Sequence, residues 1–203
     1  MTRELLASDA YDSIVAFTRS PLGYEHPKLR NLIVDFDDMD NWSDNIRGDD
    51  LFSALGTTRK QAGSKAAQYK VDFHYQAGAC RAAADNGVRR LFLVSSPSAD
   101  ARSPFFYMRM KGELDELVAT LGFETVVYFK PSIIEGHRPD GRAAEKVSGT
   151  VAHFASTWLP GMAKYRPISG EELGRSIANC AIGSLEEGRH TFELDEIFEL
   201  LDH

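Results

Sequence analysis

The chain alternates short apolar runs with longer stretches in which apolar residues recur at helical spacing. Five of the runs are rich in β-branched and aromatic residues, as is typical of strands in a sheet that is covered on both faces. These predicted strands are residues 13–18, 32–36, 51–55, 90–95 and 125–129. The alternation of strands and helices predicts an α/β fold with a parallel sheet and right-handed crossovers.

Four stretches carry the pattern of helices, at about residues 2–7, 66–86, 107–121 and 171–187. Gly87 follows the second stretch as a C-cap, where a left-handed backbone is needed. Ser169 and Glu172 match a capping box at the start of the last stretch, and Gly188 follows its end. The acid-rich residues 35–50 are expected to form a solvated connection.

The length and net charge of the chain limit the number of domains and the kinds of partner it can bind. The 203 residues fit one domain spanning residues 1–203. A net charge of −7 makes the chain a poor non-specific partner for nucleic acid or an anionic lipid surface. No apolar run approaches the roughly 20 residues of a membrane-spanning helix.

Cysteine and histidine usage gives no sign of a metal site. Cys80 and Cys180 are too few for a disulfide scaffold or a cysteine-ligated metal, and their helical positions predict inert, buried thiols. No two of the six histidines have i,i+4 spacing with an adjacent carboxylate. With no signal-peptide pattern at the start of the chain, we expect a soluble, cytoplasmic protein.

The main chemical signal is Tyr107 four residues before Lys111. This spacing places both side chains on one helical face, and a nearby ammonium lowers the pKa of a tyrosine. Such a tyrosine can exchange a proton with a carbonyl or alcohol oxygen, while the lysine can hold a ribose hydroxyl. Tyr24 and Lys28 have the same spacing, but Pro27 between them argues against a regular helix.

The context of Tyr107 supports this interpretation. The preceding strand ends at Ser95 and Ser96, and the carboxyl ends of parallel strands are where open α/β sheets bind ligands. A serine hydroxyl there can donate to the same substrate oxygen as the tyrosine. The alternative is a buried tyrosine at a helix start, a solvated lysine and a serine turn.

Several cations also follow predicted strands. Arg19 follows the first strand, residues 56–60 include two cations after the third, and Arg138 and Arg142 follow the fifth. An arginine in the position of Arg19 suits a nucleotide 2′-phosphate, whereas an acid would suit a free 2′-hydroxyl. The alternative is that these are ordinary solvated loop residues.

Together these features resemble the atypical short-chain dehydrogenase/reductases, in particular the Tat-interacting-protein-like oxidoreductases. The resemblance covers about residues 2–142 and, more loosely, 143–200. It is carried by four strings: Leu55-Gly56-Thr57-Thr58-Arg59, Val94-Ser95-Ser96, Tyr107-x-x-x-Lys111-Gly112-Glu113 and Phe129-Lys130-Pro131.

The resemblance implies a Rossmann-like, doubly wound parallel sheet and a nicotinamide cofactor, NADP in preference to NAD. Tyr107 would be the catalytic acid/base, Lys111 its partner and ribose anchor, and Ser96, or else Ser95, the residue that holds the substrate oxygen. Arg19 would meet the 2′-phosphate. The remaining cofactor contacts implied are Leu55, Gly56, Thr57, Ile134 and Arg142.

The chain departs from this family in two places. Many relatives carry an asparagine near the position of Val71-Asp72, and a carboxylate cannot donate as an amide does. The family's first strand and its Gly-rich turn, which holds the pyrophosphate, are both absent here, so we expect a gap between neighbours in the sheet. A truncated or mis-started version of a longer protein would explain this, as would a family fold that persists without binding; we favour the first.

The sequence therefore predicts an NADP-preferring reductase of a small carbonyl compound. The alternative is a dinucleotide-sensing regulatory or scaffold protein that binds a partner protein and turns over little. Residues 143–170 are the candidate substrate-side region. Within it, four apolar residues at helical spacing either wall a pocket or belong to a packed core helix, the latter being favoured: Val147, Val151, Phe154 and Trp158.

Overall fold

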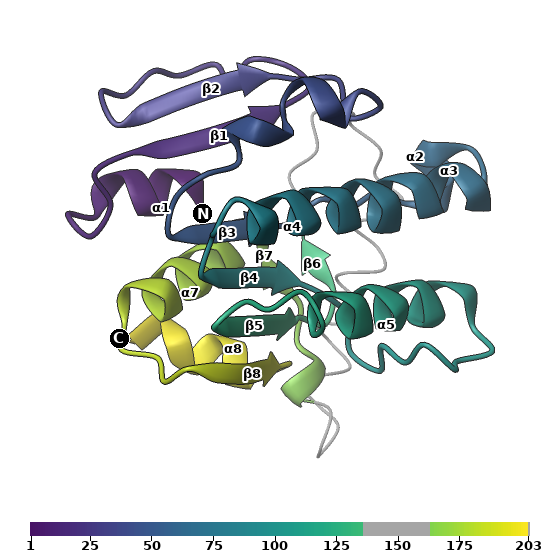
Figure 1. The fold of residues 1–203 in the computed structure, drawn as a ribbon. Coiled ribbons are helices and arrows are strands. Elements are labelled where there is room, and N and C mark those ends of the chain that lie inside the picture. Colours follow the sequence, from purple (N-terminus) through teal and green to yellow (C-terminus); the bar gives the residue numbers. More distant parts are fainter. Residues whose placement is uncertain (136–162, 203) are drawn as a thin grey trace.

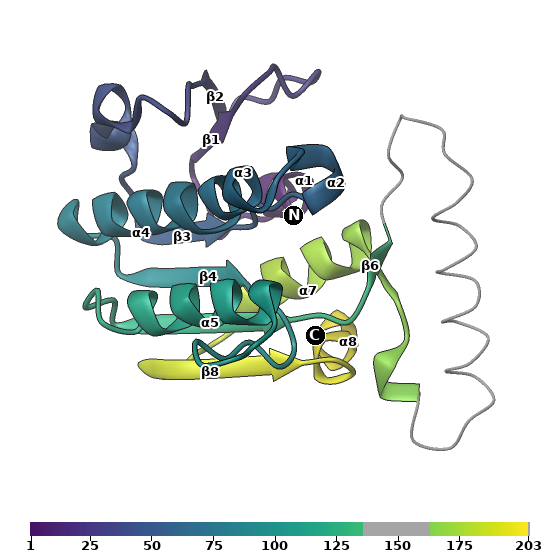
Figure 2. The same cartoon turned by 90° about the vertical axis from the view of Figure 1, so that its right-hand side faces the viewer.

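The computed structural model describes residues 1–135 and 163–202, and this part of the chain is an α/β structure with three parallel sheets (Figures 1 and 2). The largest sheet has the strand order β3-β4-β5-β8, with bounds Asp50–Ser53, Arg90–Val94, Thr125–Lys130 and Gly188–Glu193. A two-stranded sheet pairs β1 (Ile14–Thr18) with β2 (Leu29–Ile33). A second short pair joins β6 (Ile134–Glu135) to β7 (Ile168–Ser169).

Helices separate the consecutive strands of the largest sheet, and α1 and α8 lie near the two ends of the chain. Their bounds are α1 Thr2–Ala7, α2 Arg59–Ala62, α3 Lys65–Tyr69, α4 Gln76–Asp85, α5 Phe106–Val118, α7 Gly170–Ile182 and α8 Glu196–Glu199. A π-helical segment, Lys70–Tyr75, joins α3 to α4. Single 3₁₀ turns occupy Met39–Asn41, Ser43–Asn45, Ala163–Tyr165 and Leu200–Asp202.

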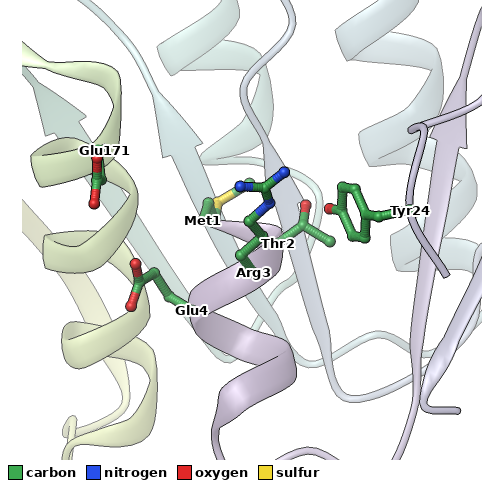
Figure 3. A pocket seen from close by; sticks show the side chains of 6 residues that line it. All are labelled: Met1, Thr2, Arg3, Glu4, Tyr24 and Glu171. Carbon is green, nitrogen blue, oxygen red and sulfur yellow. The ribbon is translucent and has the colours of Figure 1, made fainter. Parts of the chain in front are cut away.

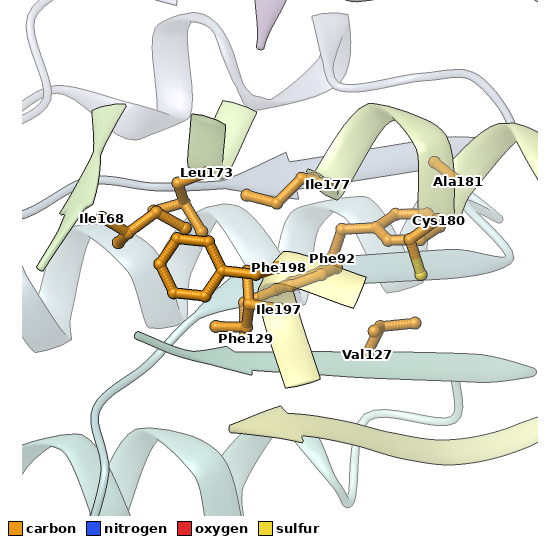
Figure 4. Close-up of a cluster of buried hydrophobic side chains, with 10 residues drawn as sticks. All are labelled: Phe92, Val127, Phe129, Ile168, Leu173, Ile177, Cys180, Ala181, Ile197 and Phe198. Atoms are coloured by element: carbon orange, nitrogen blue, oxygen red, sulfur yellow. The ribbon is translucent and has the colours of Figure 1, made fainter. Parts of the chain in front are cut away.

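The central strands β4 and β5 are buried on both faces because their side chains alternate between two cores. Leu91 and Leu93 of β4 pack with α4 and α5 on one face. Phe92 of β4 and Val127 and Phe129 of β5 point to the other face, against α7 and α8, as Figure 4 shows. The sheet therefore forms the middle layer between two sets of helices.

The structure confirms the predicted fold class and most of the predicted elements. The helix predicted at residues 2–7, the capping box of Ser169 and Glu172, and the left-handed Gly87 (φ 82°) are all present. Residues 24–28 are not helical, as Pro27 predicted. Residues 147–158, predicted to be helical, lie outside the described residues.

Other boundaries differ from the prediction. Strand β2 lies three residues earlier than residues 32–36, and the last long helix ends at Ile182, so Gly188 opens strand β8 instead of ending that helix. Strand β8 was not predicted, because Gly188–Glu193 contains a single large apolar residue, Phe192. This composition suits its position at one end of the sheet order.

The prediction of a solvated connection at residues 35–50 is wrong. Phe36, Trp42 and Ile46 are 8%, 5% and 3% exposed and form a core cluster with residues of α4 and the turn that follows it. The Trp42 indole N–H also donates to the carbonyl of Asp35 at 2.8 Å. The neighbouring acidic residues Asp35, Asp37, Asp38 and Asp40 are exposed, and their number led to the wrong prediction for the whole segment.

The gap expected in the sheet is present. Strands β1 and β3 belong to different sheets, and within the described residues neither pairs with a strand on its facing edge. In Figure 1 their arrows point in the same direction, as do those of β4 and β5. The two halves are thus arranged like parts of one parallel sheet that is interrupted between β1 and β3.

Candidate functional site

The predicted catalytic residues lie where β4 gives way to α5. The strand ends at Val94, Ser95 and Ser96 follow at once, and α5 begins at Phe106. Tyr107 is in the first turn of α5 and is 40% exposed, whereas Lys111, one turn later, is 3% exposed. The phenol of Tyr107 is therefore accessible to a ligand from solvent, and the ammonium one helical turn later is buried.

Lys111 is anchored to the end of β4. Its Nζ donates to the carbonyl of Val94 at 2.9 Å. Burial lowers the pKa of Lys111, while the carboxylates of Asp72 and Asp115 act in the opposite direction and favour the charged form. An ammonium has three N–H donors, so two remain for other partners, such as the hydroxyls of a ribose.

The pKa of Tyr107 is shifted in the direction opposite to the one expected from the sequence. Burial and, after it, the negative charge of Asp72 raise the pKa of Tyr107, and a hydrogen bond with Ser96 only partly offsets them. The predicted lowering by Lys111 is therefore wrong for this structure. A raised pKa keeps the phenol protonated, which is the form that donates a proton.

The two serines have different environments. The hydroxyl of Ser95 donates to Oδ1 of Asp115 at 2.7 Å. The hydroxyl of Ser96 donates to the carbonyl of Pro97 at 3.4 Å, and a hydrogen bond with Ser96 acts to lower the pKa of Tyr107. The two serines thus differ in their partners, and Ser95 is the one that bonds to the carboxylate of Asp115.

Asp115 is a member of this cluster that the sequence reasoning missed. Its Oδ2 lies 3.3 Å from Nζ of Lys130, and the hydroxyl of Tyr128 donates to its backbone carbonyl at 3.1 Å. The available signal was spacing, because Tyr107, Lys111 and Asp115 follow one another at i, i+4 and i+8 on one face of α5. A carboxylate in the third place supports the ammonium in the second.

The loop after β3 is held by Gln68 of α3 and Asp72 of the π-helical segment. Oδ2 of Asp72 accepts from the N–H of Thr57 at 3.0 Å, and Nε2 of Gln68 donates to the carbonyl of Thr57 at 3.2 Å. A Cβ on Gly56 would lie 3.3 Å from Oδ1 of Asp72, so glycine allows this close approach. The carboxylate noted as a departure from the family thus fixes the backbone of the loop.

The predicted cofactor residues are spread along the carboxyl edge of the strands. Arg19 is exposed directly after β1, and Leu55 and Gly56 follow β3. Ile134, in β6, is 45% exposed. Arg142 lies outside the described residues. The N–H of Thr57 is already donated to Asp72, so it is not available to a phosphate.

Three groups near these strand ends have a chemistry that a dinucleotide can use. They are the exposed guanidinium of Arg19 after β1, the backbone at Gly56 in the loop after β3, and the buried ammonium of Lys111 at the end of β4. In parallel sheets such groups meet at one edge, where ligands bind.

Two hollows lie away from Tyr107. One, of about 440 Å³, runs between β1 and β3 and reaches Leu55. The other, of about 370 Å³, is shown in Figure 3, where Thr2 and Arg3 of α1 lie between Tyr24 and Glu171. The side chains of Tyr107 and Lys111 line neither of them. Within the described residues, none of the helices has the length and apolar character needed to cross a membrane.

Solved structures with similar folds are Rossmann-type proteins. One, titled "MoeE5 in complex with UDP-glucuronic acid and NAD", has a TM-score of 0.66 at 16% identity over 90% of this chain and 68% of its own. A dTDP-glucose 4,6-dehydratase (DesIV) from Streptomyces venezuelae with NAD bound has a TM-score of 0.65 at 16% identity over 99% and 76%. At this identity they establish the Rossmann-type fold.

Curated relatives are more similar in sequence. "Protein FMP52, mitochondrial" of Candida albicans is 32% identical over 176 residues, covering 83% of this chain and 76% of the relative. The Aspergillus clavatus protein of the same name is 32% identical over 189 residues, covering 90% and 81%. That of Emericella nidulans is 39% identical over 139 residues, 58% of its length.

These names overturn one expectation. All three relatives are named as mitochondrial proteins, so the cytoplasmic location expected from the sequence is wrong. No protein-family model matches the chain. On the strength of the shared sequence over three quarters or more of two relatives, the chain belongs to the FMP52 family.

Proposed function

We propose that this chain is an oxidoreductase of the atypical short-chain dehydrogenase/reductase type that reduces a small carbonyl compound with NADPH. The observation that carries the proposal is the arrangement on α5: a protonated, partly exposed Tyr107 beside Ser96, one turn from the buried Lys111. Bound NAD in the titles of the similar solved structures supports a nicotinamide cofactor. The mitochondrial names of the relatives support a mitochondrial location.

Tyr107 is the proton donor in this proposal. Carbonyl reduction places negative charge on the substrate oxygen, and a nearby phenol O–H can neutralise it as that charge develops. Ser96 donates a second hydrogen bond to the same oxygen. The raised pKa of Tyr107 favours this direction of reaction, because a neutral phenol is required at the start.

Lys111 holds the ribose of the cofactor in this proposal. Its bond to Val94 fixes the ammonium at the strand end, and its spare donors suit a ribose hydroxyl. Arg19, exposed after β1, is suited to the 2′-phosphate of NADP, which NAD lacks. Leu55 and Gly56 would lie along the dinucleotide. Bound nicotinamide would supply the hydride.

Calorimetric titration of NADPH and NADH into the full chain, followed by cofactor oxidation with a panel of small carbonyl compounds, tests the proposal. Micromolar binding of NADPH with carbonyl-dependent oxidation is expected. Binding without turnover on any carbonyl would replace the reductase with the second candidate, a dinucleotide sensor. The observation that favours the sensor is the interruption of the sheet between β1 and β3, because it lies beside the loop that would line the cofactor. Absence of binding would contradict both.

A further inference from the structure

Lys111 carries a buried charge that its hydrogen bond to Val94 does not balance. The residue is 3% exposed, and the carbonyl that accepts from its Nζ is polar but uncharged. Among the described residues, none of the salt bridges includes Lys111. A buried ammonium is stable only when nearby charges offset its loss of water. The charges around Lys111 therefore decide whether it stays protonated.

Two carboxylates, those of Asp72 and Asp115, act on Lys111 and are held in different ways. Burial lowers the pKa of Lys111, and both carboxylates act against that effect. Asp72 is bound to backbone, because its Oδ2 accepts from the N–H of Thr57 at 3.0 Å. Asp115 is bound through side chains: the hydroxyl of Ser95 donates to its Oδ1 at 2.7 Å, and its Oδ2 is buried.

A second ammonium approaches Asp115 from strand β5. Nζ of Lys130 lies 3.3 Å from Oδ2 of Asp115, and the side chains of Lys130 and Asp115 are only 16% and 14% exposed. Nζ of Lys130 also lies 3.7 Å from Oε1 of Glu193, the residue paired with it in strand β8. Charges of alternating sign therefore lead from Lys111 through Asp115 and Lys130 to Glu193, whose side chain is 44% exposed.

This charged cluster joins one helix to three neighbouring strand ends. Asp115 belongs to α5, whereas Lys130 and Glu193 are the last residues of β5 and β8, which lie side by side in Figure 1. Ser95 follows directly after β4, whose end pairs with that of β5. The contacts of Asp115 thus tie α5 to the same edge of the sheet at which Lys111 is bonded.

The other titratable groups around the cluster are neutral. The hydroxyl of Tyr128 donates to the backbone carbonyl of Asp115, and the thiol of Cys80 in α4 packs in the same core as Tyr128. Burial raises the pKa of Tyr128 and that of Cys80 to about 12. Burial also raises the pKa of Tyr107, one turn before Lys111. All three groups are therefore uncharged below about pH 10.

The loss of Asp115 would affect the two lysines unequally. Lys130 would keep Glu193 as a partner, at the exposed end of the cluster. Lys111 would keep Asp72 of the two carboxylates that act on it, and at 3% exposure it could not turn to water instead. The charge of Asp115 therefore matters more to Lys111 than to Lys130, the lysine that lies in direct contact with it.

We propose that Asp115 is a positioning residue whose carboxylate, shared with Lys130, keeps Lys111 protonated at the end of β4. Its importance for the cofactor rests on the proposed function, in which Lys111 holds a ribose. An ammonium bonded to Val94 has two N–H donors left for hydroxyls, whereas a neutral amine would have one. Loss of the charge would therefore weaken the hold on the ribose.

NMR of the full chain, with lysine labelled at Cε with the NMR-active carbon isotope, tests the proposal without any turnover. The signal of Lys111 is assigned with Lys111→Arg, and its titration midpoint is measured between about pH 6 and 11. Asp115→Asn keeps an acceptor for Ser95 but removes the negative charge, so the midpoint should fall by about 1 pH unit or more. Lys130→Gln removes the ammonium that shares the carboxylate, so the midpoint should rise. The matched control, Glu193→Gln, changes a charge that meets Lys130 alone and should leave the midpoint unchanged.

Shifts of opposite sign in Asp115→Asn and Lys130→Gln separate this role from a general loosening of the packing, which would move both midpoints in the same direction. An unchanged midpoint in Asp115→Asn, or shifts of the same sign in the two variants, would overturn the proposal. If Asp115→Asn does not fold, Lys130→Gln decides alone: a raised midpoint of Lys111 supports the proposal, and an unchanged or lowered one contradicts it.

Calorimetric titration of NADPH at a series of pH values tests the consequence for the cofactor. Binding to the parent chain should weaken as pH rises through the pKa of Lys111, and in Asp115→Asn it should weaken at a lower pH, by the shift that NMR records. The same pH dependence in both proteins, beside a shifted NMR midpoint, would contradict the ribose contact of Lys111. Absence of NADPH binding by the parent would contradict the proposed function, whereas the NMR result decides the role of Asp115 independently.

Discussion

Nζ of Lys111 donates to the backbone carbonyl of Val94 at 2.9 Å, tying the first half of α5 to the carboxyl end of β4. This contact sets where Tyr107 stands, because the two residues share one face of the helix a turn apart. It also brings the ammonium within the influence of two carboxylates, Asp72 and Asp115, from different elements. The candidate site is therefore built around a buried charge at a strand end.

The two serines are expected to give opposite results when replaced. Ser96→Ala should lower kcat/KM about 100-fold with little change in the free energy of unfolding, because it removes a donor to the substrate oxygen. Ser95→Ala should lower the free energy of unfolding by about 1–3 kcal/mol, because it removes the hydroxyl that donates to Oδ1 of Asp115, while kcat/KM changes little. Urea unfolding and steady-state kinetics on both variants check this. The reverse pattern would assign the substrate contact to Ser95.

The alkaline limit of carbonyl reduction should depend on Asp72. Reduction requires protonated Tyr107, so activity falls as pH rises through the pKa of Tyr107, which burial and then Asp72 raise above the ordinary value of a tyrosine. Asp72→Asn keeps an acceptor for Thr57 but removes the negative charge, which lowers that pKa. The alkaline limb of kcat/KM against pH should therefore move to lower pH. An unchanged or higher limb would show that Asp72 does not act on the phenol.

Arg19 should determine the preference between the two dinucleotides. Arg19→Ala is expected to weaken NADPH binding about tenfold, less at high salt because the side chain is exposed, and to leave NADH binding unchanged. Arg30→Ala, at an exposed arginine of β2, is the matched control and should alter neither affinity. Equal loss for both cofactors in Arg19→Ala would contradict a role at the 2′-phosphate.

Gly112 should be the least replaceable helical glycine near the site. A Cβ there would collide with the backbone of Asp100 and Ala101, which cross α5, so Gly112→Ala should cost about 1–3 kcal/mol of unfolding free energy or more. The control is Gly78→Ala in α4, where the added Cβ meets the flexible side chain of Met39, with Sδ at 2.5 Å. That change should be close to neutral. Equal destabilisation of the two variants in urea unfolding would refute the packing argument.

Much of this fold follows from local pattern. Strands β4 and β5 were predictable because they are uninterrupted apolar runs, and α7 because Ser169 and Glu172 form its capping box. Strand β8 was not, because its pairing with β5 depends on backbone hydrogen bonds that leave little trace in a polar sequence. Trp42 was missed because its burial depends on α4, far along the chain.

In the candidate site too, local spacing was predictable and contacts between distant parts of the chain were not. Spacing alone placed Tyr107 and Lys111 on one face of α5, and the end of a strand placed the serines nearby. The raised pKa of Tyr107 could not be predicted, because it depends first on the burial of the phenol and then on Asp72, which belongs to the π-helical segment. The partner of Ser95 was hidden for the same reason: Asp115 meets it through tertiary packing.

Steady-state NADPH oxidation by the full chain and by Tyr107→Phe, over one panel of small carbonyl compounds, tests the central claim most directly. The account predicts a loss of 100-fold or more in kcat/KM for the variant, with the affinity for NADPH unchanged, because only the proton donor is removed. A variant that retained its turnover on every carbonyl accepted by the parent would contradict it.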